Sequence, residues 1–173
     1  DSKVSFVDIA GRKVVREVGV GAEPEGMAVS PDGKQVICTS ESASLVHFID
    51  AATGKLLDSV MVGTRPRDAK YTRDGRQLWV SSEARATVAV FDPARRNVLV
   101  TIDFDADDAA PENVQAVGIA LDATGDRAFI ALGRGNHVAD VDAHTFTVRR
   151  YIPTGLRTWG IALSPDETRV YAA

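Results

Sequence analysis

Short runs of alternating apolar and polar residues, rich in β-branched side chains, recur along the whole chain between turns of Gly, Pro and Asp. A period of two residues predicts β-strands, because successive side chains of a strand point to opposite faces. No helical period is visible. The first complete set predicts four strands, over residues 25–30, 35–40, 45–50 and 55–62. Its turns place Pro where a fixed φ helps and Gly where φ must be positive.

Two series of markers repeat in phase along the sequence. The intervals are 42, 50 and 42 residues in the first series and 42, 42 and 50 in the second, which assigns one insertion to residues 103–112. The first series is SPDG at Ser30–Gly33, TRDG at Thr72–Gly75, DATG at Asp122–Gly125 and SPDE at Ser164–Glu167. The second is Asp8, Asp50, Asp92 and Asp142, each closing an apolar run. Because each Asp precedes a turn, we interpret this series as turn caps and not as a metal or catalytic cluster.

Four strands in each repeat of about 42 residues predict an all-β fold, a β-propeller of four-stranded antiparallel blades. The chain opens inside a third strand and stops inside a second one, so about four blades are expected. Three arrangements fit a chain of about four blades: a small closed ring, a piece of a longer propeller, or two copies paired into one ring. The piece of a longer propeller is favoured. Within one domain, 1–173, the expected divisions are a half blade (1–20), blades at 21–62, 63–104 and 105–154 with the insertion, and a half blade (155–173).

The loops that enter the innermost strands vary more than the turns at the other end of each blade. In register, one position holds Glu25, Arg67, Val117 and Trp159, and a nearby position holds Glu23, Arg65, Gln115 and Arg157. Innermost strands line the central channel of a propeller. We therefore predict a binding rim at the channel mouth formed by Glu23, Glu25, Arg65, Arg67, Gln115, Arg157 and Trp159.

Two interpretations of this rim stay open. Arg could act as a bidentate donor and Trp as a stacking face for an anionic or quinone-like ligand, or for a partner. Alternatively, the rim is a solvated polar mouth whose charges pair with one another. If the rim binds, replacing Arg67 and Arg157 by Ala is expected to abolish binding and to leave the melting temperature nearly unchanged.

Evidence for catalysis or metal binding is thin. The three histidines come from different elements and form no metal-binding pair, and there is no Gly-x-Ser-x-Gly elbow or phosphate-binding loop. The insertion begins Asp103-x-Asp105-x-Asp107, like a calcium loop, but Asp108 and Val114 stand where an EF-hand needs Gly and Glu. We expect a solvated loop there. An irregular calcium site is the weaker alternative, and no other cofactor is indicated.

The composition bears on nucleic-acid binding, membrane insertion and disulfide formation. The net charge of −4 argues against a nucleic-acid surface, and no apolar stretch is long enough to span a bilayer. The single cysteine, Cys38, cannot form an intrachain disulfide and is expected to be a buried apolar residue. The chain begins at Asp1 without a signal-like segment, so the residues do not fix the compartment.

Four segments resemble the YVTN-type β-propellers, and most of all the propeller associated with PQQ-dependent alcohol catabolism. They are residues 23–41, 65–83, 114–148 and 157–171. The resemblance implies a propeller of seven blades, of which about four are present here. It also implies the bacterial periplasm and a link to a quinoprotein dehydrogenase system, while it says little about mechanism.

Together these observations predict a non-catalytic binding or assembly module with a protein partner, accessory to PQQ-dependent alcohol oxidation. One alternative is an enzyme or ligand carrier with a lactonase-like, hydrolase-like or cofactor site at the channel mouth. A DNA-binding propeller is a further alternative that the charge disfavours. A homodimer is expected only if four blades are the natural length.

Overall fold

The structure, a computed structural model, describes residues 2–173, apart from the side chain of Asp108. The described chain folds into five antiparallel β-sheets, which we call blades 1 to 5 in chain order. Blade 1 holds β1 (Lys3–Asp8) and β2 (Lys13–Gly19), and blade 2 holds β3 (Pro24–Val29), β4 (Gln35–Ser40), β5 (Leu45–Asp50) and β6 (Leu56–Met61). Blade 3 holds β7 (Pro66–Tyr71), β8 (Leu78–Ser82), β9 (Thr87–Asp92) and β10 (Asn97–Asp103). Blade 4 holds β11 (Ala116–Leu121), β12 (Arg127–Leu132), β13 (His137–Asp142) and β14 (Thr147–Pro153), and blade 5 holds β15 (Ile161–Leu163) and β16 (Val170–Ala172).

The predicted all-β fold with four-stranded antiparallel blades is confirmed. In blades 2, 3 and 4, each strand pairs with the next one along the chain. The strands predicted over 25–30, 35–40, 45–50 and 55–62 correspond to β3, β4, β5 and β6, with ends that differ by one residue at most. The division of the chain into one domain with those repeat boundaries stays a prediction.

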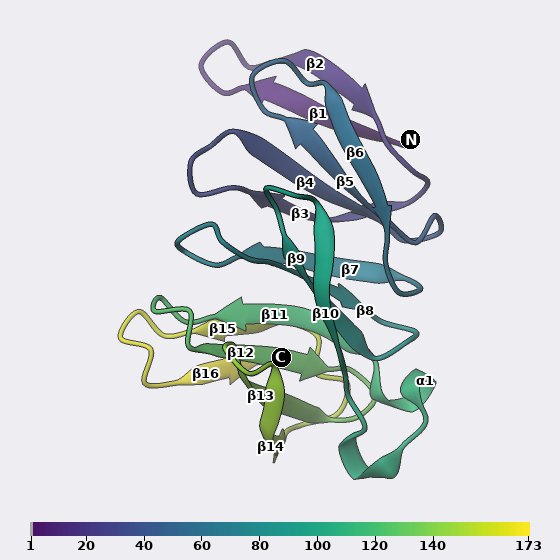
Figure 1. Ribbon diagram of the computed structural model, residues 1–173, viewed down its shortest axis with the longest axis vertical. Coiled ribbons are helices and arrows are strands. Elements are labelled where there is room, and N and C mark those ends of the chain that lie inside the picture. The colour runs from purple at the N-terminus through teal and green to yellow at the C-terminus, as the bar shows by residue number, and fades with distance from the viewer. Residues whose placement is uncertain (1) are drawn as a thin grey trace.

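The blades stack face to face, and their first strands lie side by side at the inner edge of the stack (Figure 1). Blade 1 lies at one end of this stack (Figure 1), and blade 5 packs against blade 4 through β15 and β11. Apolar residues fill the spaces between blades. Phe48 of blade 2 meets Phe91 of blade 3 edge to face at 5.9 Å, and Trp79 of blade 3 lies fully buried against blade 4. Burial between blades therefore stabilises the fold more than any single sheet could.

Glycine at the third position of the inner strands β3 and β11 lets neighbouring blades approach closely. A Cβ on Gly26 would lie 2.6 Å from the carbonyl oxygen of Arg67 in the next blade. A Cβ on Gly118 would likewise collide with the carbonyl oxygen of Trp159. Gly160 has nothing within 4 Å at this position, because no blade follows blade 5 in the structure.

The turn chemistry predicted from the sequence is present. Asp50, Asp92 and Asp142 each accept hydrogen bonds from main-chain N–H groups two or three residues further on, which confirms the interpretation as turn caps. Asp8 accepts one from Ala10. Gly33, Gly75 and Gly125 adopt φ between 71° and 78°, a left-handed conformation that glycine adopts without strain.

The insertion differs from the solvated loop expected of it. It forms a short 3-10 helix, η1 (Ala106–Asp108), and one helical turn, α1 (Pro111–Val114). Phe104, Ala106 and Val114 are buried in the core between blades 3 and 4. The sequence did not predict this burial, because the segment is mostly acidic and its apolar residues do not follow the two-residue period of a strand.

Two other observations concern composition. Cys38 is fully buried, as predicted, and burial raises the pKa of its thiol to about 11. Within residues 2–173, no helix is long and apolar enough to cross a membrane.

Candidate binding rim

The residue two places before each of Glu25, Arg67, Val117 and Trp159 has a left-handed backbone conformation. Glu23, Arg65, Gln115 and Arg157 all adopt φ between 55° and 63°. For residues other than glycine the left-handed region costs about 1–2 kcal/mol, because Cβ approaches the following carbonyl oxygen. The fold thus holds four long polar side chains at a position that glycine would occupy without strain.

Arg67 is the centre of an ion-pair network at this rim. Its guanidinium lies 2.5 Å from a carboxylate oxygen of Glu83, 2.6 Å from one of Glu41 and 3.3 Å from one of Glu25. These acids come from the loops after β8 and β4 and from β3, so the network joins blades 2 and 3. Its partners hold Arg67 in one position, which makes this part of the rim rigid.

Arg65 and Gln115 extend the same network. Arg65 pairs with Glu41 at 2.6 Å and lies 3.6 Å from Glu83. Gln115 donates from Nε2 to Glu83 at 3.1 Å, which links blade 4 to the cluster. Its Oε1 is buried beside Gly133 and has no hydrogen-bond partner among the described residues. Each of the three complete blades therefore contributes to one connected polar cluster.

Trp159 covers one side of this cluster and reaches the surface. Arg67 lies 5.5 Å from the centroid of the indole ring, and Arg157 lies 5.6 Å from it. Leu156, in the same loop, is 88% exposed. Arg157 is also exposed, and its N–H donates to the Asn136 side chain at 2.9 Å. The loop over residues 155–160 thus presents an apolar, a cationic and an aromatic side chain on a fixed backbone.

The electrostatics of the cluster oppose proton transfer by Arg67. Burial acts to lower the pKa of its guanidinium, but the hydrogen bond that Arg67 donates to Glu83 and the charges of Glu83, Glu41 and Glu25 outweigh it and raise the pKa. The guanidinium is therefore a permanent cation. Because its donors face carboxylates inside the rim, an anionic ligand would have to compete with three internal acids for it.

The structure brings together Glu25, Arg65, Arg67 and Trp159, with Gln115 joined through Glu83 and Arg157 joined through Trp159. Glu23 adjoins the cluster through its main chain, because its carbonyl oxygen accepts from the Glu41 N–H at 2.8 Å, while its carboxylate accepts a hydrogen bond from Ser42. The sequence interpretation missed Glu41 and Glu83. A signal was available, since each follows a Ser at the end of a second strand and lies at the same end of its blade.

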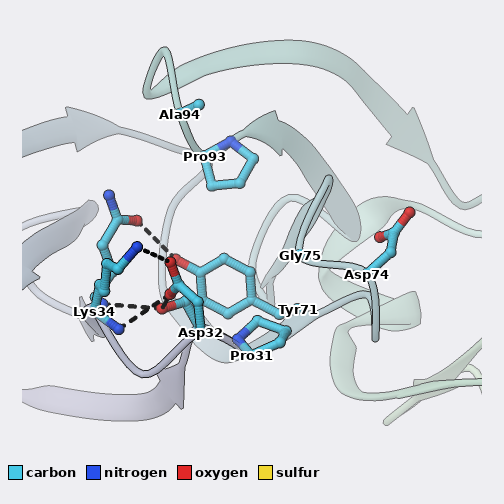
Figure 2. A pocket seen from close by; sticks show the side chains of 10 residues that line it. Pro31, Asp32, Lys34, Tyr71, Asp74, Gly75, Pro93 and Ala94 are labelled. Carbon is cyan, nitrogen blue, oxygen red and sulfur yellow. Dashed lines mark hydrogen bonds and ion pairs between the residues drawn. The ribbon is translucent and has the colours of Figure 1, made fainter.

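The other end of the blades contains a groove between blades 2 and 3, of about 500 Å³ (Figure 2). Tyr71 lies in it between Pro31 and Pro93, and its hydroxyl donates to the Gln35 side chain at 3.0 Å. The groove at the corresponding place between blades 3 and 4 measures about 150 Å³ and includes His144. Neither groove is lined by rim residues.

The acidic insertion was expected to be a solvated loop, with an irregular calcium site as the weaker alternative. Among the described residues, no three His, Cys, Asp or Glu side chains gather in a way that could hold a metal ion. Asp105 instead bonds to the Tyr151 hydroxyl at 2.8 Å, and Asp107 lies 4.0 Å from His137. The side chain of Asp108, part of the same proposal, lies outside the described residues.

No family model and no curated protein sequence matches this chain. Among solved structures it is similar to hydrazine synthase of Kuenenia stuttgartiensis, with a TM-score of 0.87 and 21% identity over 98% of this chain and 48% of that one. It is also similar to the dihydro-heme d1 dehydrogenase NirN in complex with DHE, with a TM-score of 0.82 and 16% identity over 100% of this chain and 37% of that one.

These likenesses show the fold alone, because both identities are low. Both neighbours are β-propeller folds, so the chain has a β-propeller fold, as its 42-residue period predicts. It spans less than half the length of either neighbour.

Proposed function

We propose that this β-propeller is a non-catalytic binding or assembly module, and that its partner is a protein that docks on the rim. The left-handed backbone at Glu23, Arg65, Gln115 and Arg157 carries the proposal. All four repeats keep this strained backbone, although the side chain differs from one repeat to the next. This combination is typical of a surface whose side chains contact a partner. A purely structural turn would favour glycine, and three of the four SPDG-type turns have it at their left-handed position, the fourth having Glu167, whereas none of the four rim positions has glycine.

The chemistry of the rim favours a protein surface over a reacting substrate. The buried acids of the rim are engaged by Arg65, Arg67 and Gln115, so they are poorly placed to act as a general base. Glu23, Glu25 and Arg65 of the rim are exposed, and so are Leu156 and Arg157 in the loop where Trp159 is half-buried. Trp and Arg are the residue types that most often dominate protein–protein binding energy, and a preorganised backbone reduces the entropy lost on binding.

The identity of the partner rests on the sequence resemblance. The four YVTN-like segments include the entrances to all four inner strands and therefore the rim itself. We accordingly assign the module to the YVTN-type propellers, place it in the periplasm and propose a quinoprotein alcohol dehydrogenase as its partner. The structural neighbours support the fold and not this assignment.

Site-specific cross-linking tests the proposal. A photoreactive residue at Leu156 probes the rim, and one at exposed Arg73, in the SPDG-type turn of blade 3, serves as the matched control. We expect cross-links to a quinoprotein alcohol dehydrogenase from position 156 alone, and their loss in the Arg157→Ala, Trp159→Ala double variant. Equal cross-linking from both positions would contradict a docking rim.

Titration with free PQQ separates the module from a ligand carrier. The proposed module leaves the absorbance spectrum of PQQ unchanged. Saturable binding that Trp159→Ala abolishes would favour the ligand-carrier alternative instead, because indole would then stack on the quinone.

A further inference from the structure

His47 is a buried histidine at a position where the other two complete blades have alanine. It lies on β5, opposite Cys38 of β4 and Ser59 of β6. Ala89 of blade 3 and Ala139 of blade 4 take the same place in their sheets. His47 is 2% exposed. Because blades 3 and 4 form their four-stranded sheets with alanine, the repeat itself does not require an imidazole here.

Both nitrogens of the ring form hydrogen bonds. Nε2 lies 2.9 Å from the Gly21 nitrogen and 2.9 Å from Ser40 Oγ, and Nδ1 lies 2.8 Å from Ser59 Oγ. A main-chain N–H can only donate, so Nε2 is the acceptor and the ring proton is on Nδ1, which donates to Ser59. The imidazole therefore joins β4 and β6 to the linker between blades 1 and 2.

The Ser40–His47 pair has the spacing of a nucleophile and its base, but its surroundings do not suit catalysis. Ser40 is fully buried, and it shares Nε2 with the N–H of Gly21. A substrate could not reach the hydroxyl. The arrangement instead suits a group that fastens the chain.

Gly21 belongs to the linker over residues 20–23, which ends at the rim residue Glu23. A Cβ on Gly21 would lie 2.8 Å from the Cβ of Ser40, so the linker packs directly on β4. The carbonyl oxygen of Glu23 accepts from the N–H of Glu41 at 2.8 Å. The Gly21–His47 bond thus fastens the linker two residues before the left-handed backbone of Glu23.

Blade 3 has the same packing without the imidazole. A Cβ on Gly63 would lie 2.7 Å from the Cβ of Ser82, much as in blade 2. Ala89 offers no polar atom, and Ser82 Oγ is buried without a hydrogen-bond partner among the described residues. The linker that leads to Arg65 is therefore packed alike, but alanine cannot titrate. This difference makes blade 3 an internal control for blade 2.

Apolar side chains surround the imidazole on the side of blade 1. Val4 of β1 and Val18 of β2 pack in one cluster with Cys38 and Ile49, which lie on the same face of blade 2 as His47. Burial lowers the pKa of His47. It also raises the pKa of the Cys38 thiol to about 11, so the thiol next to the ring is neutral.

The charged groups on the elements around His47 have other partners. Asp58 accepts from the N–H of Ser59 at 2.8 Å. The others are Glu23 with Ser42, Glu41 with Arg65 and Arg67, Lys3 with Glu17, and Arg16 with the carbonyl oxygen of Ala52. Burial therefore sets the direction of the pKa shift, and the ring takes a proton only under more acidic conditions than an exposed histidine would.

We propose that His47 is an acid-operated latch on the linker that carries Glu23 to the rim. When the ring is protonated, Nε2 becomes a donor and faces the donor N–H of Gly21, so that bond breaks. The Ser40 hydroxyl can rotate to accept from Nε2–H, and Ser59 goes on accepting from Nδ1–H. Protonation therefore releases the linker and leaves β4 and β6 joined. A buried N–H without a partner is costly, so Gly21 must move towards water.

Acid should accordingly weaken the rim where blade 2 contributes to it. A released linker no longer holds Glu23 in its left-handed conformation. The effect on docking rests on the proposed function, whereas the latch itself does not. At neutral pH the ring is neutral and the latch is closed.

Amide hydrogen exchange measured by NMR, from neutral pH down to about pH 5, tests the latch. We expect the protection factor of the Gly21 amide to fall about tenfold for each pH unit until the folded pKa of His47 is reached, because release requires one proton. Amides in β8 should keep constant protection over the same range. Constant protection of Gly21 through the pKa that the ring signals of His47 report would overturn the proposal.

Two variants separate the latch from general effects of acid. In His47→Gln the amide oxygen can accept from the N–H of Gly21 and does not titrate, so the protection of Gly21 should not depend on pH. His144 is exposed, and His144→Asn is the matched control that should respond as the parent does. A pH-dependent loss that persists in His47→Gln would overturn the proposal. The titration of the parent decides the question even where His47→Gln does not fold.

Docking is measured separately, through cross-linking from position 156. Acidification should lower the yield in the parent and not in His47→Gln. A pH-sensitive Gly21 amide with a pH-independent yield would overturn the link between the latch and docking. Absence of cross-links at neutral pH would instead contradict the proposed function, and the exchange data would still decide the latch.

Discussion

The inner strands begin and end in left-handed residues, but the two ends use that conformation differently. After the strand, in the SPDG-type turns, Gly33, Gly75 and Gly125 take φ near 71° to 78°. Before the strand, at the rim, Glu23, Arg65, Gln115 and Arg157 take φ near 55° to 63°. The turn end thus avoids strain by omitting the side chain in three of its four repeats, Glu167 at φ 55° being the exception, while the rim end accepts strain and keeps the side chain in all four.

This difference separates the parts of the repeat that maintain the fold from the part that can vary. The turn after the inner strand repeats both backbone and chemistry, with Asp32 and Asp74 accepting N–H groups at the same place. The rim repeats the backbone and changes the side chains, so each blade contributes something different to one cluster. A repeated scaffold can therefore carry a surface that is not repeated.

The largest effect is expected at the centre of the rim. Arg67→Ala removes the shared partner of Glu25, Glu41 and Glu83 and should lower the free energy of unfolding by about 2–3 kcal/mol. The sequence interpretation expected an Arg67, Arg157 double variant to melt normally, and this geometry predicts otherwise. Chemical denaturation measures the change, with exposed Arg157→Ala as the control that should stay near the parent protein. Equal stability of both variants would contradict a structural role for Arg67.

At the opposite end, Gly125→Ala should lower the free energy of unfolding by about 1–2 kcal/mol. Its φ is 78° and nothing lies within 4 Å of the position of a Cβ, so strain is the only cause. Gly155→Ala is the matched control, because it has the same open space without a positive φ. A similar loss in both variants would show that the left-handed φ of Gly125 does not set the cost.

Two histidines should give opposite pH dependences of stability. Burial lowers the pKa of His47, whose Nε2 accepts from Gly21 N–H at 2.9 Å, so the unfolded chain binds the proton more readily. Its contribution should be lost as pH falls below about 6.5. The hydrogen bond with Asp126 raises the pKa of His144, so its contribution is present below about 6.5 and disappears as pH rises through the folded pKa.

Melting temperatures of His47→Gln and His144→Asn between mildly acidic and mildly basic pH check this. His47→Gln should reduce the loss of stability on acidification, and His144→Asn should increase it relative to the parent. Parallel curves for the two variants would contradict the opposite assignments.

The smallest effect on stability is expected from relieving the left-handed backbone strain at the rim. Arg157→Gly should raise the free energy of unfolding by about 0.5 kcal/mol, because relief of the left-handed strain slightly exceeds the added flexibility of the unfolded chain. The same variant should weaken partner cross-linking from position 156. A stability gain with binding retained would show that the side chain of Arg157 is dispensable at the rim.

Local patterns in the sequence determined much of this protein. Alternation and turn residues give β3, β4, β5 and β6 to within about a residue, because strand faces and turn conformations depend on neighbours a few positions away. The repeat period gives the propeller, and the in-phase alignment places Glu25, Arg67 and Trp159 at equivalent positions near the channel.

Only the tertiary structure decided which side chains meet. Glu41 and Glu83 lie 26 and 16 positions from Arg67 along the chain, and they reach it because blades 2 and 3 stack with their loops at the same end. The burial of Phe104 and Val114 from an acidic insertion was decided in the same way. Pairing between blades depends on their packing distance and rotation, which a period in the sequence does not encode.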